Sequence, residues 1–286
     1  MRSFGARLRR AMDTRGPLCV GIDPHSSLLN RWGLPDTVDG LARFSRTVVD
    51  ALADRVAVLK PQSAFFERFG SAGIAVLELT IRQSRAAGAL VLLDVKRGDI
   101  GSTAQAYAQA YLDPASPLYV DAITASPYLG FGSMAPLLDE AKAHGGGVFV
   151  LVLTSNPEGA QVQRARTADG RTVAQMLLDE VAARNDGAQP LGSVGVVVGA
   201  TVSMATTPGA AHDDLSRING PVLAPGLGAQ GATAADLRNL FAGVERSVLP
   251  SYSREVLGHG PSASGLRAAA ERSLAVCRKV LNYPVL

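Results

Sequence analysis

Three charged residues, Asp94, Lys96 and Asp99, follow a short apolar segment of the sequence. That segment, 90–93, has the length and branching of a strand buried on both faces of a parallel sheet. Because side chains alternate along a strand, Asp94 and Lys96 are expected to point the same way, and Asp99 follows Gly98 in the next turn. These charges predict a site that is polarised before a substrate arrives, although structural ion pairs cluster charge in the same way.

Lys60 ends the apolar segment that precedes this one, at the same edge of the expected sheet. A lone lysine there would fit a surface residue whose stem packs on apolar groups. Beside Asp94 it gains a partner, and alternating positive and negative charges hold one another ionised where the dielectric is low. Further polar residues follow other apolar segments: Asp23, Thr124, Thr154, Ser155 and Arg254.

A glycine-rich segment at 225–231 contains the pattern Gly-x-Gly-x-x-Gly. In a dinucleotide-binding fold this pattern opens the first strand-helix unit, whereas here it comes late in the chain. We therefore favour a phosphate site of a barrel, where glycines let backbone amides approach an anion. Arg254 would add a forked, charge-assisted contact to the same phosphate. Gln230 could reach it when the loop closes, and the alternative is a glutamine that faces solvent.

Eight short apolar segments recur along the chain, separated by longer segments that permit helices. The expected strands are 18–22, 56–59, 90–93, 120–124, 147–153, 194–198, 222–224 and 246–249. The expected helices include 38–53, 72–87, 102–111, 172–183, 233–240 and 264–281. This alternation predicts parallel strands with right-handed crossovers. Eight regular units favour an α/β fold with a single (β/α)8 TIM barrel over residues 1–286, rather than a doubly wound open sheet.

The composition is that of a globular domain of enzyme size. Of the 286 residues, 47% are hydrophobic and 19% charged, and the net charge is only +3. Dispersed Arg and Lys disfavour binding to nucleic acid, and every apolar stretch is too short to cross a membrane. The basic N-terminal segment lacks the apolar region of a targeting peptide. We therefore expect it to form a helix that closes one barrel end. The two cysteines, which form no disulfide pattern, indicate a reducing, cytoplasmic compartment.

Cysteine and histidine give no sign of a metal site. Cys19 and Cys277 are far apart and belong to no Cys-x-x-Cys pattern, and the four histidines have no ligand spacing. We therefore expect neither a disulfide framework nor a bound metal. Ser155 has no Gly-x-Ser-x-Gly pattern around it, which disfavours acyl transfer and favours a role in hydrogen bonding.

Five segments of the chain together carry a family resemblance. They are Gly-Ile-Asp-Pro-His (21–25), Lys-Pro-Gln-Ser-Ala-Phe-Phe-Glu (60–67), Asp-Val-Lys-Arg-Gly-Asp-Ile (94–100), Leu-Thr-Ser-Asn (153–156) and Pro-Gly-Leu-Gly-Ala-Gln-Gly (225–231). In combination they resemble the orotidine 5′-phosphate decarboxylase family, specifically its long bacterial (type 2) subgroup. The resemblance covers the whole chain. Many members of the family end the last strand with Gly-Arg, where this chain has Pro-Ser-Tyr-Ser-Arg at 250–254.

This resemblance implies decarboxylation of orotidine 5′-monophosphate to uridine 5′-monophosphate, the last step of pyrimidine synthesis, without a cofactor. Without an organic electron sink, preformed charge must stabilise the carbanion. Lys96 is suited to stabilise and then protonate it, and Asp94 would repel the leaving carboxylate. The resemblance also implies a homodimer with shared sites and the following roles: Asp99 and Thr103 serving the partner subunit's site, Asp23 and Lys60 at ribose hydroxyls, Ser155 at the pyrimidine edge, and Gln230 and Arg254 at the phosphate.

Other functions fit the same charges. A magnesium-dependent sugar-phosphate aldolase or decarboxylase of the same barrel group shares Asp-x-Lys-x-x-Asp, but Lys60 places a cation where a metal would bind. A Schiff-base aldolase would use Lys96 as its nucleophile. A non-catalytic barrel that binds a phosphate ligand would not need Lys96 at all.

Overall fold

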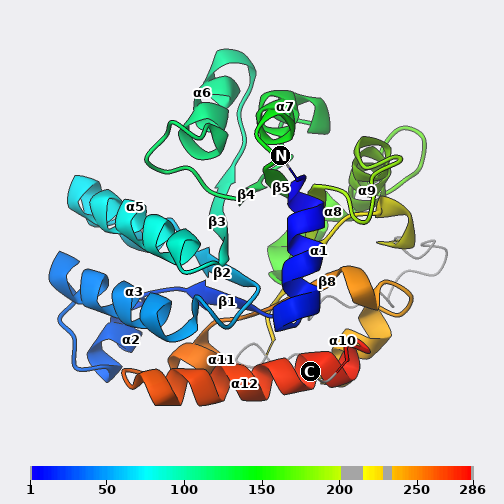
Figure 1. Cartoon of the computed structure of the whole chain (residues 1–286). Coiled ribbons are helices and arrows are strands. Elements are labelled where there is room, and N and C mark those ends of the chain that lie inside the picture. Colours follow the sequence, from blue (N-terminus) through cyan, green and yellow to red (C-terminus); the bar gives the residue numbers. More distant parts are fainter. Residues whose placement is uncertain (1, 201–214, 228–233, 285–286) are drawn as a thin grey trace.

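The computed structural model describes residues 2–200, 215–227 and 234–284, and its centre is a closed barrel of eight parallel strands in chain order (Figure 1). The predicted (β/α)8 TIM barrel is therefore confirmed. The strands are β1 (Cys19–Ile22), β2 (Val58–Pro61), β3 (Leu90–Arg97), β4 (Ala122–Ala125), β5 (Gly147–Leu153), β6 (Val194–Val198), β7 (Val222–Pro225) and β8 (Val248–Tyr252). That all 286 residues form one domain stays a prediction, because part of the chain lies outside the described residues.

The helices of the described residues surround these strands, and α1 crosses in front of them in Figure 1. They are α1 (Phe4–Arg15), α2 (Ser26–Arg31), α3 (Val38–Leu52), α4 (Ala64–Glu67), α5 (Gly70–Ala86), α6 (Gly101–Leu112), α7 (Ala135–Ala143), α8 (Ala160–Gln163), α9 (Val173–Arg184), α10 (Ala234–Leu240), α11 (Arg254–Leu257) and α12 (Ala263–Val280). Short 3-10 helices are η1 (Phe131–Met134), η2 (Pro157–Gly159), η3 (Leu215–Ile218) and η4 (Glu245–Ser247).

Helix boundaries agree with the predictions, and side-chain caps mark where several helices begin. The hydroxyls of Thr37, Thr172 and Ser262 accept backbone N–H groups in the first turns of α3, α9 and α12. Such caps satisfy donors that have no partner within the helix. All six predicted helices agree with the observed ones to within two residues at each end.

Two strands extend three or more residues past their predicted carboxyl ends, whereas the carboxyl ends of the other six agree with the predictions to within two residues. β3 continues to Arg97 instead of ending at residue 93, and β8 ends at Tyr252 instead of residue 249. In β8, Pro250 pairs with Ala224 of β7 and Ser251 pairs with Cys19 of β1. Pairing with β7 and β1 thus continues β8 beyond Pro250, because a proline removes only one N–H donor from the ladder. Asp94 and Lys96 therefore lie within β3 and not beyond it.

The helix α1 closes the amino end of the barrel, as predicted. Its residues Phe4, Leu8 and Met12 are buried, and the Phe4 ring meets the Phe149 ring edge to face with centroids 5.9 Å apart. Arg7 pairs with Asp121, which precedes β4, and donates to the carbonyl of Gly145, which precedes β5. Arg15 donates to the carbonyls of Ala53, Val56 and Gly88, which precede β2 and β3. The opposite, carboxyl end of the barrel is left open to ligands.

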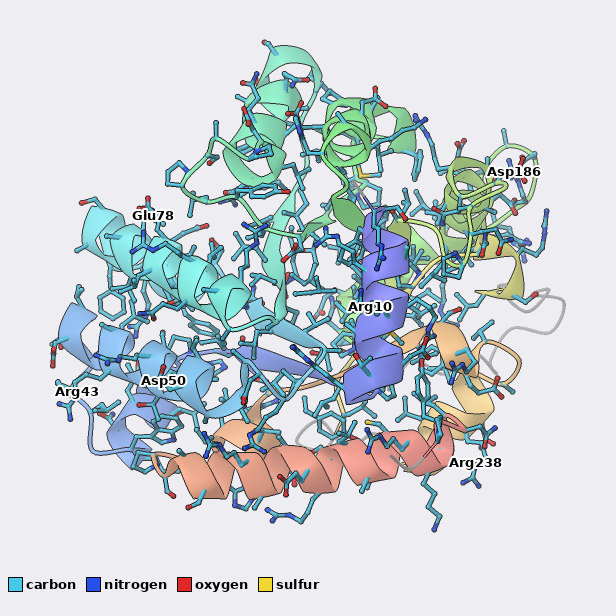
Figure 2. All side chains as sticks on the ribbon, viewed as in Figure 1. Arg10, Arg43, Asp50, Glu78, Asp186 and Arg238 are labelled. Atoms are coloured by element: carbon cyan, nitrogen blue, oxygen red, sulfur yellow. The ribbon has the colours of Figure 1, made fainter. Side chains whose placement is uncertain are left out.

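The outer surface carries charges of both signs at separate places. Exposed side chains labelled in Figure 2 include Arg10, Arg43, Asp50, Asp186 and Arg238. Across the described ranges, no helix combines the length and the apolar character that a membrane span requires.

Candidate active site

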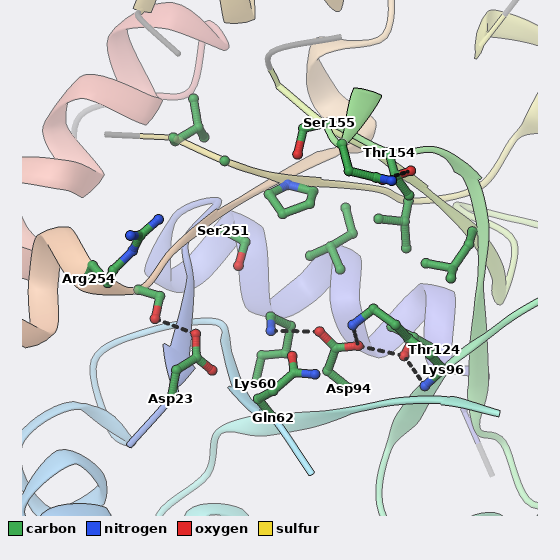
Figure 3. Close-up of a pocket in the computed structure, with 18 residues that line it drawn as sticks. Asp23, Lys60, Gln62, Asp94, Lys96, Thr124, Thr154, Ser155, Ser251 and Arg254 are labelled. Carbon is green, nitrogen blue, oxygen red and sulfur yellow. Dashed lines mark hydrogen bonds and ion pairs between the residues drawn. The ribbon is translucent and has the colours of Figure 1, made fainter. Parts of the chain in front are cut away.

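A cavity of about 330 Å³ lies at the carboxyl ends of the strands (Figure 3). Its apolar wall includes Leu151, Val197, Leu223, Pro225 and Leu227. Its polar lining is Asp23, Lys60, Gln62, Asp94, Lys96, Thr124, Thr154, Ser155, Asn156, Ser251, Ser253 and Arg254. Six predicted site residues are therefore brought together here: Asp23, Lys60, Asp94, Lys96, Ser155 and Arg254.

Asp94 lies between two lysines at the floor of this cavity. Its Oδ2 is 3.0 Å from Nζ of Lys60, which comes from β2, and its Oδ1 is 2.6 Å from Nζ of Lys96 (Figure 3). Lys60 and Asp94 are buried, whereas 46% of the Lys96 side chain is exposed. The Lys96 ammonium group is therefore the most exposed member of the array, and its counterion Asp94 is buried together with Lys60.

Mutual attraction keeps Lys60 and Asp94 charged although both side chains are buried. Burial by itself lowers the pKa of Lys60, but the negative charges of Asp94 and Asp23 outweigh it and raise that pKa above its ordinary value. Burial raises the pKa of Asp94, but the charges of Lys60 and Lys96 and hydrogen bonds from Lys96 and Thr124 bring it well below its ordinary value. Asp94 is thus an anion, and Lys60 a cation, at neutral pH.

We expect the Asp94 carboxyl group of the ligand-free protein to stay ionised from about pH 5 to 9. A lowered carboxyl pKa means that the proton is taken up only below the ordinary value, which is about 3.9 for aspartate. The ¹³C chemical shift of its carboxyl carbon should therefore stay constant over that range, with the resonance assigned from the Asp94→Asn spectrum. A titration of this carbon between those limits would contradict the electrostatic account.

Asp23 and its neighbours form a second polar group in the cavity. The Ser253 hydroxyl donates to Oδ2 of Asp23, and Oδ1 is buried without a hydrogen-bond partner within the described structure. An unpaired buried carboxylate oxygen is costly, so it is suited to accept a hydrogen bond from a bound ligand. Arg254, the first residue of α11, adds a positive charge to the cavity lining.

Asp99 and Thr103 do not line this cavity. The Asp99 carboxylate accepts the N–H of Ile100 at 2.8 Å, and Thr103 is exposed in the first turn of α6. In a single chain both residues lie beside the site and do not contribute to its walls.

The predicted phosphate loop is described only in part. Gly226 and Leu227 line the cavity, and Gly226 has a φ of 99°, a conformation that favours glycine. Gln230 lies outside the described residues, together with Gly228 and Gly231.

Gln62 and Ser251 were not singled out from the sequence. Gln62 follows Lys60 by two residues, so strand alternation could have placed it in the same cavity. Ser251 lies in β8, and ending that strand at residue 249 left it outside the expected sheet.

Comparison with known proteins places the chain in a family. The family model described as "Orotidine 5'-phosphate decarboxylase / HUMPS family" matches residues 16–269. The chain belongs to this family. Two relatives named orotidine 5'-phosphate decarboxylase support the assignment to the orotidine 5'-phosphate decarboxylase family. One from Salinispora arenicola is 69% identical over 99% of both chains, and one from Streptomyces coelicolor is 62% identical over 95% of this chain and 96% of its own.

Solved structures of the orotidine 5'-phosphate decarboxylase family have the same fold as this chain. A putative orotidine 5'-phosphate decarboxylase from Streptomyces avermitilis is 58% identical, with a TM-score of 0.93 over 99% of this chain and 97% of that one. An OMP decarboxylase from Leishmania donovani is 30% identical, with a TM-score of 0.75 over 98% of this chain and 99% of that one. The family predicted from the five sequence segments is confirmed.

Proposed function

We propose that this chain decarboxylates orotidine 5′-monophosphate to uridine 5′-monophosphate in pyrimidine synthesis and acts as a carboxy-lyase. The observation that carries the proposal is the Lys60–Asp94–Lys96 array at the floor of the cavity. The names of full-length relatives with up to 69% identity support the same activity.

Lys96 is the proposed proton donor. When the bond between C6 and the carboxylate breaks, carbon dioxide leaves and the electron pair remains on C6. The Lys96 ammonium group stabilises that pair and then transfers one proton from Nζ to C6. Asp94 lies 2.6 Å from this ammonium group and would repel the substrate carboxylate, which weakens the bond that breaks.

The remaining cavity residues supply binding. Asp23, with its unpaired Oδ1, and Lys60 are assigned to the ribose hydroxyls, and Ser155 to the pyrimidine edge. Arg254 and Gln230 are assigned to the phosphate, since a guanidinium group binds phosphate through a fork of donors. Phosphate binding far from C6 would help to assemble the site around the reacting carbon.

The reaction is proposed to need no organic cofactor and no metal ion. Both oxygens of Asp94 already accept hydrogen bonds from ammonium groups. A divalent cation at Asp94 would meet the positive charges of Lys60 and Lys96 at short range, which disfavours a magnesium site.

A homodimer with shared sites is part of the proposal. Ile100, Tyr128 and Leu129 are 62%, 78% and 51% exposed, and they follow β3 and β4 beside the cavity. The two loops are joined by the Ser126 N–H, which donates to the Arg97 carbonyl at 2.8 Å, and exposed apolar side chains on adjoining loops are typical of an interface. A second copy of the chain on this patch would bring Asp99 and Thr103 toward the partner's cavity. Besides a second copy of the chain, the proposed partner is the nucleotide substrate. The proposed location of the protein is the cytoplasm.

An ultraviolet assay tests the proposed reaction. The purified protein should consume orotidine 5′-monophosphate, and exhaustive chelation should leave the rate unchanged. Loss of activity on chelation, with recovery on added magnesium, would favour the metal-dependent aldolase or decarboxylase. Absence of turnover with retained nucleotide binding would favour a non-catalytic barrel.

Gly21→Ala is expected to weaken substrate binding. A Cβ at Gly21 would lie 2.9 Å from Oδ2 of Asp23 and 3.0 Å from Cβ and Oγ of Ser253. Overpacking typically costs 1–3 kcal/mol, so displacement of Asp23 should raise KM about tenfold while kcat changes less.

Gly132→Ala serves as the matched control, because a Cβ at Gly132 meets nothing within 4 Å. Its KM should equal that of the wild type. An unchanged KM for Gly21→Ala would argue that Asp23 does not hold the substrate.

A further inference from the structure

The pairing of β3 with β4 is irregular where the catalytic lysine is proposed. Leu93 pairs with Ile123 and Arg97 pairs with Ala125, so residues 94–96 of β3 lie opposite the single residue Thr124. Extra residues of this kind bend a strand and redirect its side chains, and they are common beside active sites. The ladder with β4 is broken here, while on the β2 side Asp94 still bridges Gln62 and its carbonyl accepts the Ser63 N–H at 3.2 Å. On the β4 side, something other than regular pairing must hold residues 94–96.

Lys96 has an unusual backbone in this segment. Its φ is 46°, in the left-handed region that non-glycine residues seldom adopt. Such a conformation persists only where surrounding contacts impose it. The direction of the Lys96 side chain therefore depends on what its backbone is bonded to.

The Thr124 hydroxyl makes the bonds that replace the ladder. It accepts the backbone N–H of Lys96 at 2.9 Å and donates its own proton to Oδ1 of Asp94 at 2.8 Å. The same Oδ1 accepts Nζ of Lys96 at 2.6 Å. These contacts use one acceptor site of the hydroxyl and its single proton. Thr124 is 1% exposed, so water has little access to take over either contact.

We propose that Thr124 is a positioning residue, whose buried hydroxyl holds the left-handed backbone of Lys96 and the Asp94 carboxylate in one arrangement. It contacts both groups and performs no proton transfer to the substrate. A small misplacement of a reacting group costs a large factor in rate, so the hydroxyl acts on catalysis through Lys96. This inference rests on the proposed function.

The test compares Thr124→Val, which keeps the shape and removes the hydroxyl, with Thr124→Ser, which keeps the hydroxyl. Thr124→Val should lower kcat for orotidine 5′-monophosphate about 100-fold, with a smaller change in KM. Thr124→Ser should restore kcat to within about fivefold of the wild type, because serine has the same donor and acceptors. Affinity for the proposed product, uridine 5′-monophosphate, should be retained in both variants.

Thr80→Val is the matched control for placing valine at a buried threonine. Thr80 is 3% exposed, and its hydroxyl donates to the Val76 carbonyl within α5. It should leave kcat unchanged. Thr124→Ala removes the hydroxyl without a second apolar branch and takes the place of Thr124→Val should that variant not fold.

Crystal structures of the variants give a readout that does not need turnover. Lys96 should lose its positive φ in Thr124→Val and keep it in Thr124→Ser. Wild-type kcat in Thr124→Val, or equal losses in the valine and serine variants, would overturn the inference. If the wild-type protein does not consume orotidine 5′-monophosphate, the proposed function fails, and the Lys96 backbone still decides whether Thr124 positions it.

Discussion

Lys96→Ala is expected to lower kcat for orotidine 5′-monophosphate by at least about 10⁴-fold, since general acid catalysis and charge stabilisation are lost together. The variant should fold, because Lys96 is half exposed and Asp94 keeps its bonds to Lys60 and Thr124. Binding of uridine 5′-monophosphate should survive in part, since the proposed ribose and phosphate contacts remain. Steady-state kinetics and calorimetric titration measure the two effects separately.

Lys142→Ala is the matched control. Lys142 is an exposed lysine of α7 outside the catalytic cavity, and its replacement should leave kcat unchanged. A Lys96→Ala protein with kcat within about tenfold of the wild type would contradict the proposed proton donor. Trapping of a substrate adduct on Lys96 with borohydride would instead support the Schiff-base aldolase.

Mixing Asp99→Ala subunits with Lys96→Ala subunits is expected to restore activity that neither variant has alone. If each site combines Lys96 of one chain with Asp99 of the other, every mixed dimer contains one site with both residues intact. Equal amounts of the two variants that exchange freely in a two-fold dimer should reach about a quarter of the wild-type rate.

The mixture must be shown to contain mixed dimers, for example by native mass spectrometry of differently tagged subunits. A control mixture of Lys96→Ala subunits with Asp94→Asn subunits should not recover activity. Asp94 and Lys96 of one chain line the same cavity, so every site in a mixed dimer lacks one of the two residues. Verified mixed dimers without activity would show that Asp99 does not serve the neighbouring site.

The fold could be predicted because its signals are local. Apolar segments of three to seven residues alternate with longer segments that permit helices, and this alternation can be recognised within a short window of sequence. Strand ends were less predictable, because hydrogen bonding to neighbours decides them. Pro250 suggests a stop in the sequence, yet β7 and β1 both pair with β8 in this region.

The candidate site was predictable where strand alternation sets direction. Lys60, Asp94 and Lys96 converge as the spacing indicated. The part played by Thr124 was not accessible in this way, because it depends on a register shift between two strands and on the left-handed φ of Lys96. Neither is encoded in a short pattern. Asp99 lies in the 94–100 segment, and Thr103 was assigned from the family resemblance alone; the proposed role of both depends on a second subunit, which no short pattern in one chain encodes.

Because α1 packs on the end of the barrel opposite the cavity, changes in this helix are expected to alter the melting temperature without altering the kinetic constants. Its anchors, among them Arg7 on Asp121 and Arg15 on three carbonyls, all lie at the amino end of the barrel. The cavity opens at the other end, so changes in α1 can be selected for heat resistance alone. A thermostable variant engineered there should turn over its substrate with unaltered kcat and KM.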